Sequence, residues 1–179
     1  MPRIFVGIDL PDVIDEHLDL LCGGVPGARW EGKDKFHLTL RFVGDVDGGV
    51  VAKVGDALDD VELERFDLTL AGVGFFPPRG QPRSLWAGVE PVAPVEELHR
   101  KIERAVGKLG LEADPRKFAA HVTLGRLRDA PQDRVAAFLA HHSLFRSATF
   151  EVRAFQLFSS IRTPTGSKYR IERAYPARG

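Results

Sequence analysis

The chain has 179 residues, of which 44% are hydrophobic and 28% are charged, a globular balance that excludes a largely disordered protein. Its 25 basic and 25 acidic residues cancel, which argues against a general coat for nucleic acid but not against a local site for an RNA end. The single cysteine, Cys22, excludes an internal disulfide and a cysteine metal cluster, and we expect it to be a small buried side chain at a helix end. With no apolar run of about 18 residues and no signal-peptide order of regions at the start, we expect a cytoplasmic protein without a membrane span.

The spacing of apolar residues predicts an alternation of strands and helices along the whole chain. We expect the residues at 28–35 to form a polar connection. In chain order, the predicted elements are a strand at 3–9, a helix at 11–22, a strand at 36–42, a helix at 45–61, strands at 65–76 and 84–90, a helix at 95–110, a strand at 117–127, a helix at 131–142, a long strand at 148–160 and a final strand at 167–176. This order predicts an α+β domain made of two similar lobes, without a linker long enough to separate them.

Two of the predicted strands carry the same pattern of His, apolar residue, Thr and Leu, 84 positions apart. Side chains alternate along a strand, so His37 and Thr39 share one face, and His121 and Thr123 do the same. The opposite face of each strand is apolar. Coincidence between two half-buried strands offers no reason for the copies to match, so we predict that both strands contribute to one site.

The residue types of this pattern suit displacement at phosphorus. The attacking oxygen enters opposite the leaving oxygen, so a base and an acid are needed on opposite sides of the phosphate, and two imidazoles can fill both roles near neutral pH. Threonine hydroxyls can donate to phosphate oxygens, and arginine adds positive charge. Arg41 is expected on the face of His37, whereas the direction of Arg126 is open because it follows Gly125.

A zinc site is the competing use of the two histidines. Two ligands are too few for it, and the other four histidines lie in predicted helices without H-x-x-x-H or H-E-x-x-H spacing. The carboxylates show no recognisable ligand spacing either. We therefore expect no metal site.

The twin motifs at 37–40 and 121–124 resemble those of the two-histidine (2H) phosphoesterases. More specifically, the chain is similar to the LigT-like RNA 2′,3′-cyclic phosphodiesterases of bacteria and archaea, once described as 2′-5′ RNA ligases. The likeness covers nearly all of residues 1–179, which we expect to form a single domain. It implies two pseudo-symmetric lobes of antiparallel sheet, with helices packed outside and a central V-shaped groove between the motif strands.

The resemblance also implies an activity: hydrolysis of a 2′,3′-cyclic phosphate on an RNA or nucleotide end to a 2′-phosphate, without metal or cofactor. In that case His121 activates water, His37 protonates the departing 3′ oxygen, and Thr39 and Thr123 surround the phosphate. Arg126 matches a basic position for the phosphate or the adjacent nucleotide. We expect a monomer without an obligate protein partner.

Several assignments stay open. Arg41 is either a substrate ligand or a solvated strand residue. Trp30 either stacks on the base or packs in the core, whereas core packing is favoured for Phe5. Lys168 and Tyr169 lie at the rim of the groove or on a solvated edge strand. The alternatives for the function are ligation or cleavage of 2′-5′ linkages, hydrolysis of another cyclic phosphate, and a non-catalytic module that binds RNA ends.

Overall fold

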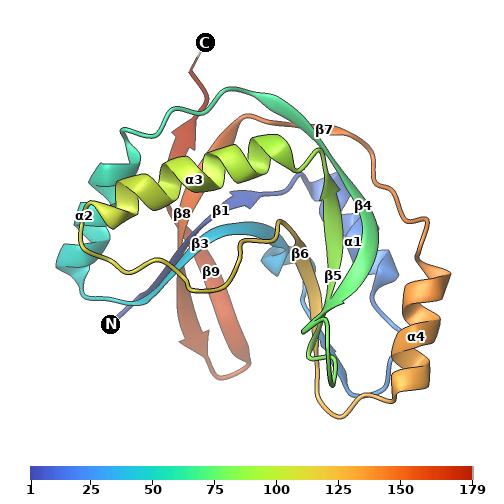
Figure 1. Cartoon of the computed structure of the whole chain (residues 1–179). Coiled ribbons are helices and arrows are strands. Elements are labelled where there is room, and N and C mark those ends of the chain that lie inside the picture. The colour runs from blue at the N-terminus through green and yellow to red at the C-terminus, as the bar shows by residue number, and fades with distance from the viewer. Residues whose placement is uncertain (179) are drawn as a thin grey trace.

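A computed structural model describes residues 1–178 as four α-helices and a nine-stranded antiparallel sheet (Figure 1). The strands are β1 (Arg3–Asp9), β2 (Ala28–Trp30), β3 (His37–Asp45), β4 (Phe66–Phe76), β5 (Ser84–Glu90), β6 (Val122–Leu127), β7 (Phe150–Val152), β8 (Ala154–Thr163) and β9 (Gly166–Pro176). The helices are α1 (Asp12–Leu21), α2 (Gly48–Leu58), α3 (Ala93–Gly107) and α4 (Gln132–His141), with a short 3₁₀ helix, η1, at Lys33–Lys35.

The sheet consists of two halves that meet in its middle. The strand order is β7-β4-β5-β6-β3-β1-β8-β9, and β2 pairs with β6 beside this path. The two motif strands, β3 and β6, are therefore neighbours, and they are joined by one residue pair, Leu38 with Val122. Figure 1 shows the sheet as an arch, with α2 and α3 on the outer side of one half and α4 on the outer side of the other. The predicted α+β class with two similar antiparallel lobes is confirmed.

Apolar residues at alternate strand positions form the core beneath the helices. In β1 these are Ile4, Val6 and Ile8, each at most 1% exposed. The apolar stripe of α3 recurs at helical spacing and is likewise buried. Because one face of the sheet is covered in this way, the other face is left for the polar side chains of the motif strands.

Three expectations about the elements were wrong. The segment 148–160 is two strands that separate at Arg153, because β7 pairs with β4 whereas β8 pairs with β1. Residues 117–121 lie in a loop, so β6 begins only at Val122. The polar connection at 28–35 contains the short strand β2, which pairs with the end of β6.

Cys22 lies directly after α1, as expected, and is partly buried. Its Sγ is 3.4 Å from the carbonyl oxygen of Leu18, and burial raises the pKa of the thiol to about 12. The thiol is therefore protonated and unreactive near neutral pH. Within residues 1–178, no helix is both long enough and apolar enough to cross a membrane.

Candidate active site

The structure brings the histidines and threonines of the two motifs together on one face of the sheet. The pair of Leu38 with Val122 fixes the antiparallel register of β3 and β6. One residue further along, this register sets His37 beside Thr123 and Thr39 beside His121. His37 is the first residue of β3, whereas His121 directly precedes β6. The site therefore lies at the junction of the two halves.

Both imidazoles are held in the same way by the backbone. His37 Nδ1 lies 2.7 Å from the carbonyl oxygen of Lys35, and His121 Nδ1 lies 2.6 Å from that of Ala119. Each partner is the residue two positions earlier. Since a carbonyl oxygen can only accept, Nδ1 must carry the proton in both rings. Nε2 is then the atom left for chemistry, as a base in the neutral ring and as an acid in the protonated one.

The surroundings of the two rings disfavour their charged forms. Burial is the main cause that lowers the pKa of His37, the bond to Lys35 opposes this, and the charge of His121 lowers it further. Burial also lowers the pKa of His121, the bond to Ala119 opposes this, and the positive charge of Arg116 lowers it further. The electrostatic coupling of the two histidines is what a shared site requires.

Aromatic side chains surround each histidine. The ring centroid of His37 lies 4.6 Å from that of Phe5 and 5.2 Å from that of Tyr169. The ring centroid of His121 lies 4.9 Å from that of Phe76 and 6.2 Å from that of Trp86. These neighbouring rings contribute to the burial that lowers the two pKa values. Phe5 and Tyr169 thus both lie beside the site, although Phe5 is only 4% exposed.

Phe76 and Trp86 were not among the predicted site residues. The signal that could have found them is the alternation in β5, where Leu85 and Ala87 are buried. Trp86 therefore belongs to the opposite, groove-facing side, together with Ser84. A large aromatic on a face of otherwise small or polar residues indicates a site rather than a core.

Arg41 does not share the face of His37, contrary to expectation. In the pairing of β1 with β3, Val6 aligns with Arg41 and Gly7 with Thr39, so Leu40 is the extra residue of a β-bulge. The bulge turns Arg41 to the helix side, where it is 7% exposed. It is a structural residue in this structure, not a solvated one or a substrate ligand.

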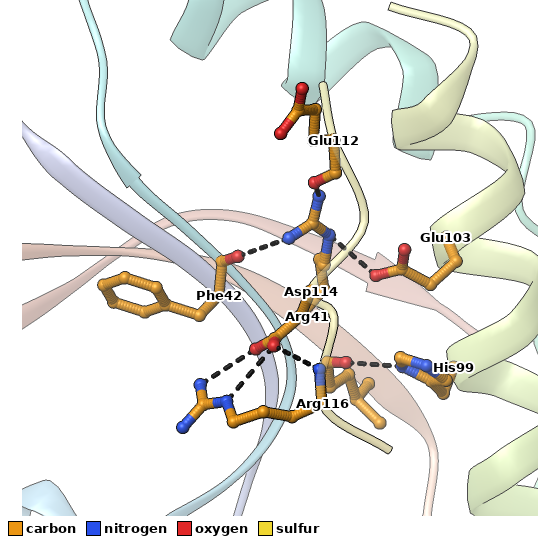
Figure 2. A network of polar contacts seen from close by, with 8 residues as sticks. Arg41, Phe42, His99, Glu103, Glu112, Asp114 and Arg116 are labelled. Carbon is orange, nitrogen blue, oxygen red and sulfur yellow. Dashed lines mark hydrogen bonds and ion pairs between the residues drawn. The ribbon is translucent and has the colours of Figure 1, made fainter. Parts of the chain in front are cut away.

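The buried guanidinium connects β3 to α3 and to the following loop (Figure 2). Arg41 Nε lies 2.6 Å from a carboxylate oxygen of Glu103 in α3. Its Nη1 donates to the carbonyl of Phe42 at 2.8 Å, and its Nη2 donates to the carbonyl of Glu112. Figure 2 also shows Arg116 bound by Asp114 in the same loop.

A second contact ties this loop to the same two elements. His99 of α3 has its Nδ1 2.7 Å from the carbonyl oxygen of Leu40, and its ring stacks on Phe118 with centroids 3.9 Å apart. Phe118 is three residues before His121. The loop at 111–120 is thus anchored at both ends, which fixes the backbone that holds His121.

Trp30 packs in the core and not on the site. Its ring centroid lies 5.6 Å from that of Phe138 in α4, and it covers Gly125 of β6. Its neighbour Arg29 is exposed on the other face of β2. Of the two roles left open for Trp30, the structure supports core packing.

Arg126 lies on the groove-facing side of β6 and is exposed. It aligns with Ser84, and Thr123 aligns with Trp86, so a bulge between them keeps both on one side despite their odd spacing. The charge of Arg126 also acts on Tyr169, which places Arg126 near the histidines.

Lys168 is exposed on β9. Within residues 1–178, no three His, Cys, Asp or Glu side chains are grouped to hold a metal ion.

Comparisons with known proteins agree with this arrangement. Residues 8–86 and 89–169 match the family described as LigT like Phosphoesterase. A protein of Archaeoglobus fulgidus named RNA 2′,3′-cyclic phosphodiesterase is 32% identical over 97% of this chain and 99% of its own. A protein of the same name from Aeropyrum pernix is 33% identical over 82% of this chain and 84% of its own.

Solved structures show the same fold. The crystal structure of E. coli LigT complexed with 3′-AMP superposes with a TM-score of 0.81 and 24% identity, covering 100% of both chains. TT0787 of Thermus thermophilus also gives a TM-score of 0.81, with 23% identity over 99% of this chain and 98% of its own. With its twin motifs on adjacent strands and a family match over most of its length, the chain belongs to the LigT-like phosphoesterases, within the 2H phosphoesterase superfamily.

Proposed function

We propose that the protein hydrolyses 2′,3′-cyclic phosphates at RNA or nucleotide ends to 2′-phosphates. The observation that carries this proposal is the matched pair of imidazoles, each with Nδ1 on a backbone carbonyl and Nε2 free on one face. A mirrored acid and base are what in-line displacement at phosphorus needs. The names of the relatives in Archaeoglobus and Aeropyrum support the same reaction.

In the proposed reaction, Nε2 of neutral His121 takes a proton from water, whose oxygen forms a bond to phosphorus. The bond from phosphorus to the 3′ oxygen breaks, and that oxygen receives the proton on Nε2 of His37. The hydroxyls of Thr39 and Thr123 donate to the non-bridging oxygens and stabilise their developing charge. Proton transfers and charge stabilisation are all supplied by side chains, so the proposed reaction requires no metal or other cofactor.

The experiment that tests this proposal uses adenosine 2′,3′-cyclic phosphate in the presence of EDTA. The expected product is adenosine 2′-phosphate. Replacing His37 or His121 by Ala should each lower kcat/KM about 100-fold or more, because general acid–base catalysis contributes at least that much. His141→Ala, at the exposed end of α4, is the matched control and should keep activity.

Full activity in either single variant would contradict the paired mechanism, and loss of activity with EDTA would contradict a metal-free reaction. The other product, adenosine 3′-phosphate, would show that the 2′ oxygen leaves instead. Formation of 2′-5′-linked dinucleotides from a pair of RNA ends would favour the ligase alternative.

A further inference from the structure

Two arginines lie directly opposite each other on neighbouring strands. The pairing of β2 with β6 aligns Arg29 with Arg126, and both are exposed. In an antiparallel pair such residues share a face, with Cβ atoms about 5 Å apart. Throughout residues 1–178, no acidic side chain lies within 4.0 Å of either guanidinium.

This arginine pair lies on the face of the active site. Side chains of Ser84 and Trp86 point to the same side of β5, and they align with Arg126 and Thr123, respectively. The arginine pair therefore lies about 7 Å along the groove from Thr123, the spacing of two residues along a strand. A step of this length is comparable to the distance between neighbouring phosphates in an extended RNA strand.

Lys35, the last residue of η1, adds another cation near Arg29. A Cβ at Gly166, the first residue of β9, would stand 3.5 Å from Lys35 Nζ and 3.9 Å from Arg29 Nη2. Tyr169, three residues further along β9, contacts the ring of His37. The cations of Arg29, Arg126 and Lys35 therefore border the end of the groove next to the histidines.

Like charges directly opposite each other destabilise a sheet, and no ion pair within 4.0 Å offsets the charge of these two among the described residues. The chain as a whole has no net charge, so the local excess does not follow from general basicity. A second phosphate in the groove would neutralise the arginine pair with charge-assisted hydrogen bonds, for which guanidinium geometry is suited.

We propose that Arg29 and Arg126, assisted by Lys35, bind the phosphate on the 5′ side of the terminal nucleotide, so that the enzyme selects RNA ends over unphosphorylated nucleoside cyclic phosphates. This inference rests on the proposed function, since it assigns the second phosphate of the same substrate. Arg29 is then a specificity-determining residue. The catalytic phosphate stays with the histidines and threonines.

The test compares three substrates: adenosine 2′,3′-cyclic phosphate, its 5′-phosphorylated form, and the dinucleotide ApA with a 2′,3′-cyclic phosphate. In the wild type, the two substrates with a second phosphate should each show a kcat/KM about tenfold above that of the first, as expected for one charge-assisted contact near solvent. The ratio should fall close to one in Arg29→Gln and be partly restored in Arg29→Lys. Arg134→Gln, an exposed arginine of α4, is the matched control and should keep the wild-type ratio.

Binding of product-like ligands separates this inference from the proposed function. Calorimetry should show adenosine 2′,5′-bisphosphate binding about tenfold more tightly than adenosine 2′-phosphate, with the difference lost in Arg29→Gln. If no substrate is hydrolysed but this difference is found, the proposed function fails and the phosphate site stands. If all three substrates are hydrolysed and the second phosphate raises kcat/KM in neither case, the proposed phosphate site is overturned while the proposed function stands. A gain for the 5′-phosphorylated nucleotide but not for ApA would overturn the selection of RNA ends.

Discussion

Gly74 determines where the indole of Trp86 lies. The two residues align between β4 and β5, and a Cβ at Gly74 would stand 2.2 Å from Cζ2 of the indole. The indole therefore packs directly against the glycine, with its centroid 6.2 Å from that of His121 and 5.3 Å from that of Phe76. The absence of one methyl group thus shapes the wall of the proposed catalytic site.

Replacing Gly74 by Ala should lower kcat/KM for adenosine 2′,3′-cyclic phosphate about tenfold. The added methyl cannot fit beneath the indole, so Trp86 must move relative to His121, and small displacements at a reacting site are costly. Steady-state kinetics and the indole fluorescence should change together. Gly107→Ala is the matched control, because a Cβ there meets nothing within 4 Å. An unchanged kcat/KM in Gly74→Ala would show that Trp86 does not shape the site.

At the scale of elements, Arg41 holds β3, α3 and the loop at 111–120 together. Its ion pair with Glu103 is buried, and its bond to the carbonyl of Glu112 reaches the segment that leads to His121. Replacing Arg41 by Met should lower the free energy of unfolding by about 3 kcal/mol, because the carboxylate of Glu103 is left buried without its partner. Chemical denaturation measures this directly.

Arg3→Met is the matched control for the loss of an arginine ion pair. Arg3 pairs with Asp45 at 3.3 Å, but both side chains are exposed, so little stability should be lost. If Arg41 instead bound substrate, its replacement would raise KM and leave the unfolding transition in place. That result would contradict the structural role.

The error over Arg41 shows what strand alternation can and cannot predict. Alternation placed His37 and Thr39 on one face, and the structure has them there. It failed for Arg41, two residues later. The extra residue of a bulge moves the following side chains to the other face of the sheet, and no sequence pattern marks its position. The direction of the Arg126 side chain was left open for a related reason. There a bulge near Gly125 keeps it on the face of Thr123.

Other elements differed in how far they could be predicted. The helices were found because their apolar stripes repeat at a helical period, as in α3. The short β2 was missed, since three residues are too few for a period, and its existence depends on pairing with β6. The break at Arg153 was missed for the same reason: only tertiary pairing assigns β7 and β8 to different neighbours.

At the scale of the whole molecule, the two halves of the sheet each supply an equivalent set of groups. Each contributes one histidine with Nδ1 on the carbonyl two residues earlier, one threonine two residues later, and aromatic neighbours. The pair of Leu38 with Val122 joins these sets where β3 and β6 meet. One imidazole from each half can then approach a phosphate from opposite sides, which neither half can do alone.

This arrangement predicts how the reaction should depend on pH. Burial lowers the pKa of both His37 and His121 below the ordinary value of about 6.5, so both rings are neutral in the free enzyme at pH 7. The proposed acid must be protonated, so kcat/KM should rise as the pH falls below 7. It should fall again once the base is protonated too, which gives a bell with its maximum below about pH 6.5. In the bound state, the anionic phosphate favours the imidazolium, so the maximum of kcat should lie at higher pH than that of kcat/KM.

Single variants assign the two limbs of this bell. If His121 is the base and His37 the acid, the residual activity of His121→Ala should lack the acidic limb, and that of His37→Ala should lack the alkaline limb. The measurement is kcat/KM from about pH 4.5 to 9 for the wild type and both variants, with His141→Ala as the control that keeps both limbs. Loss of the limbs in the opposite order would exchange the two roles while preserving the pair. A wild-type profile that is flat across this range would contradict acid–base catalysis by histidines from both halves of the sheet.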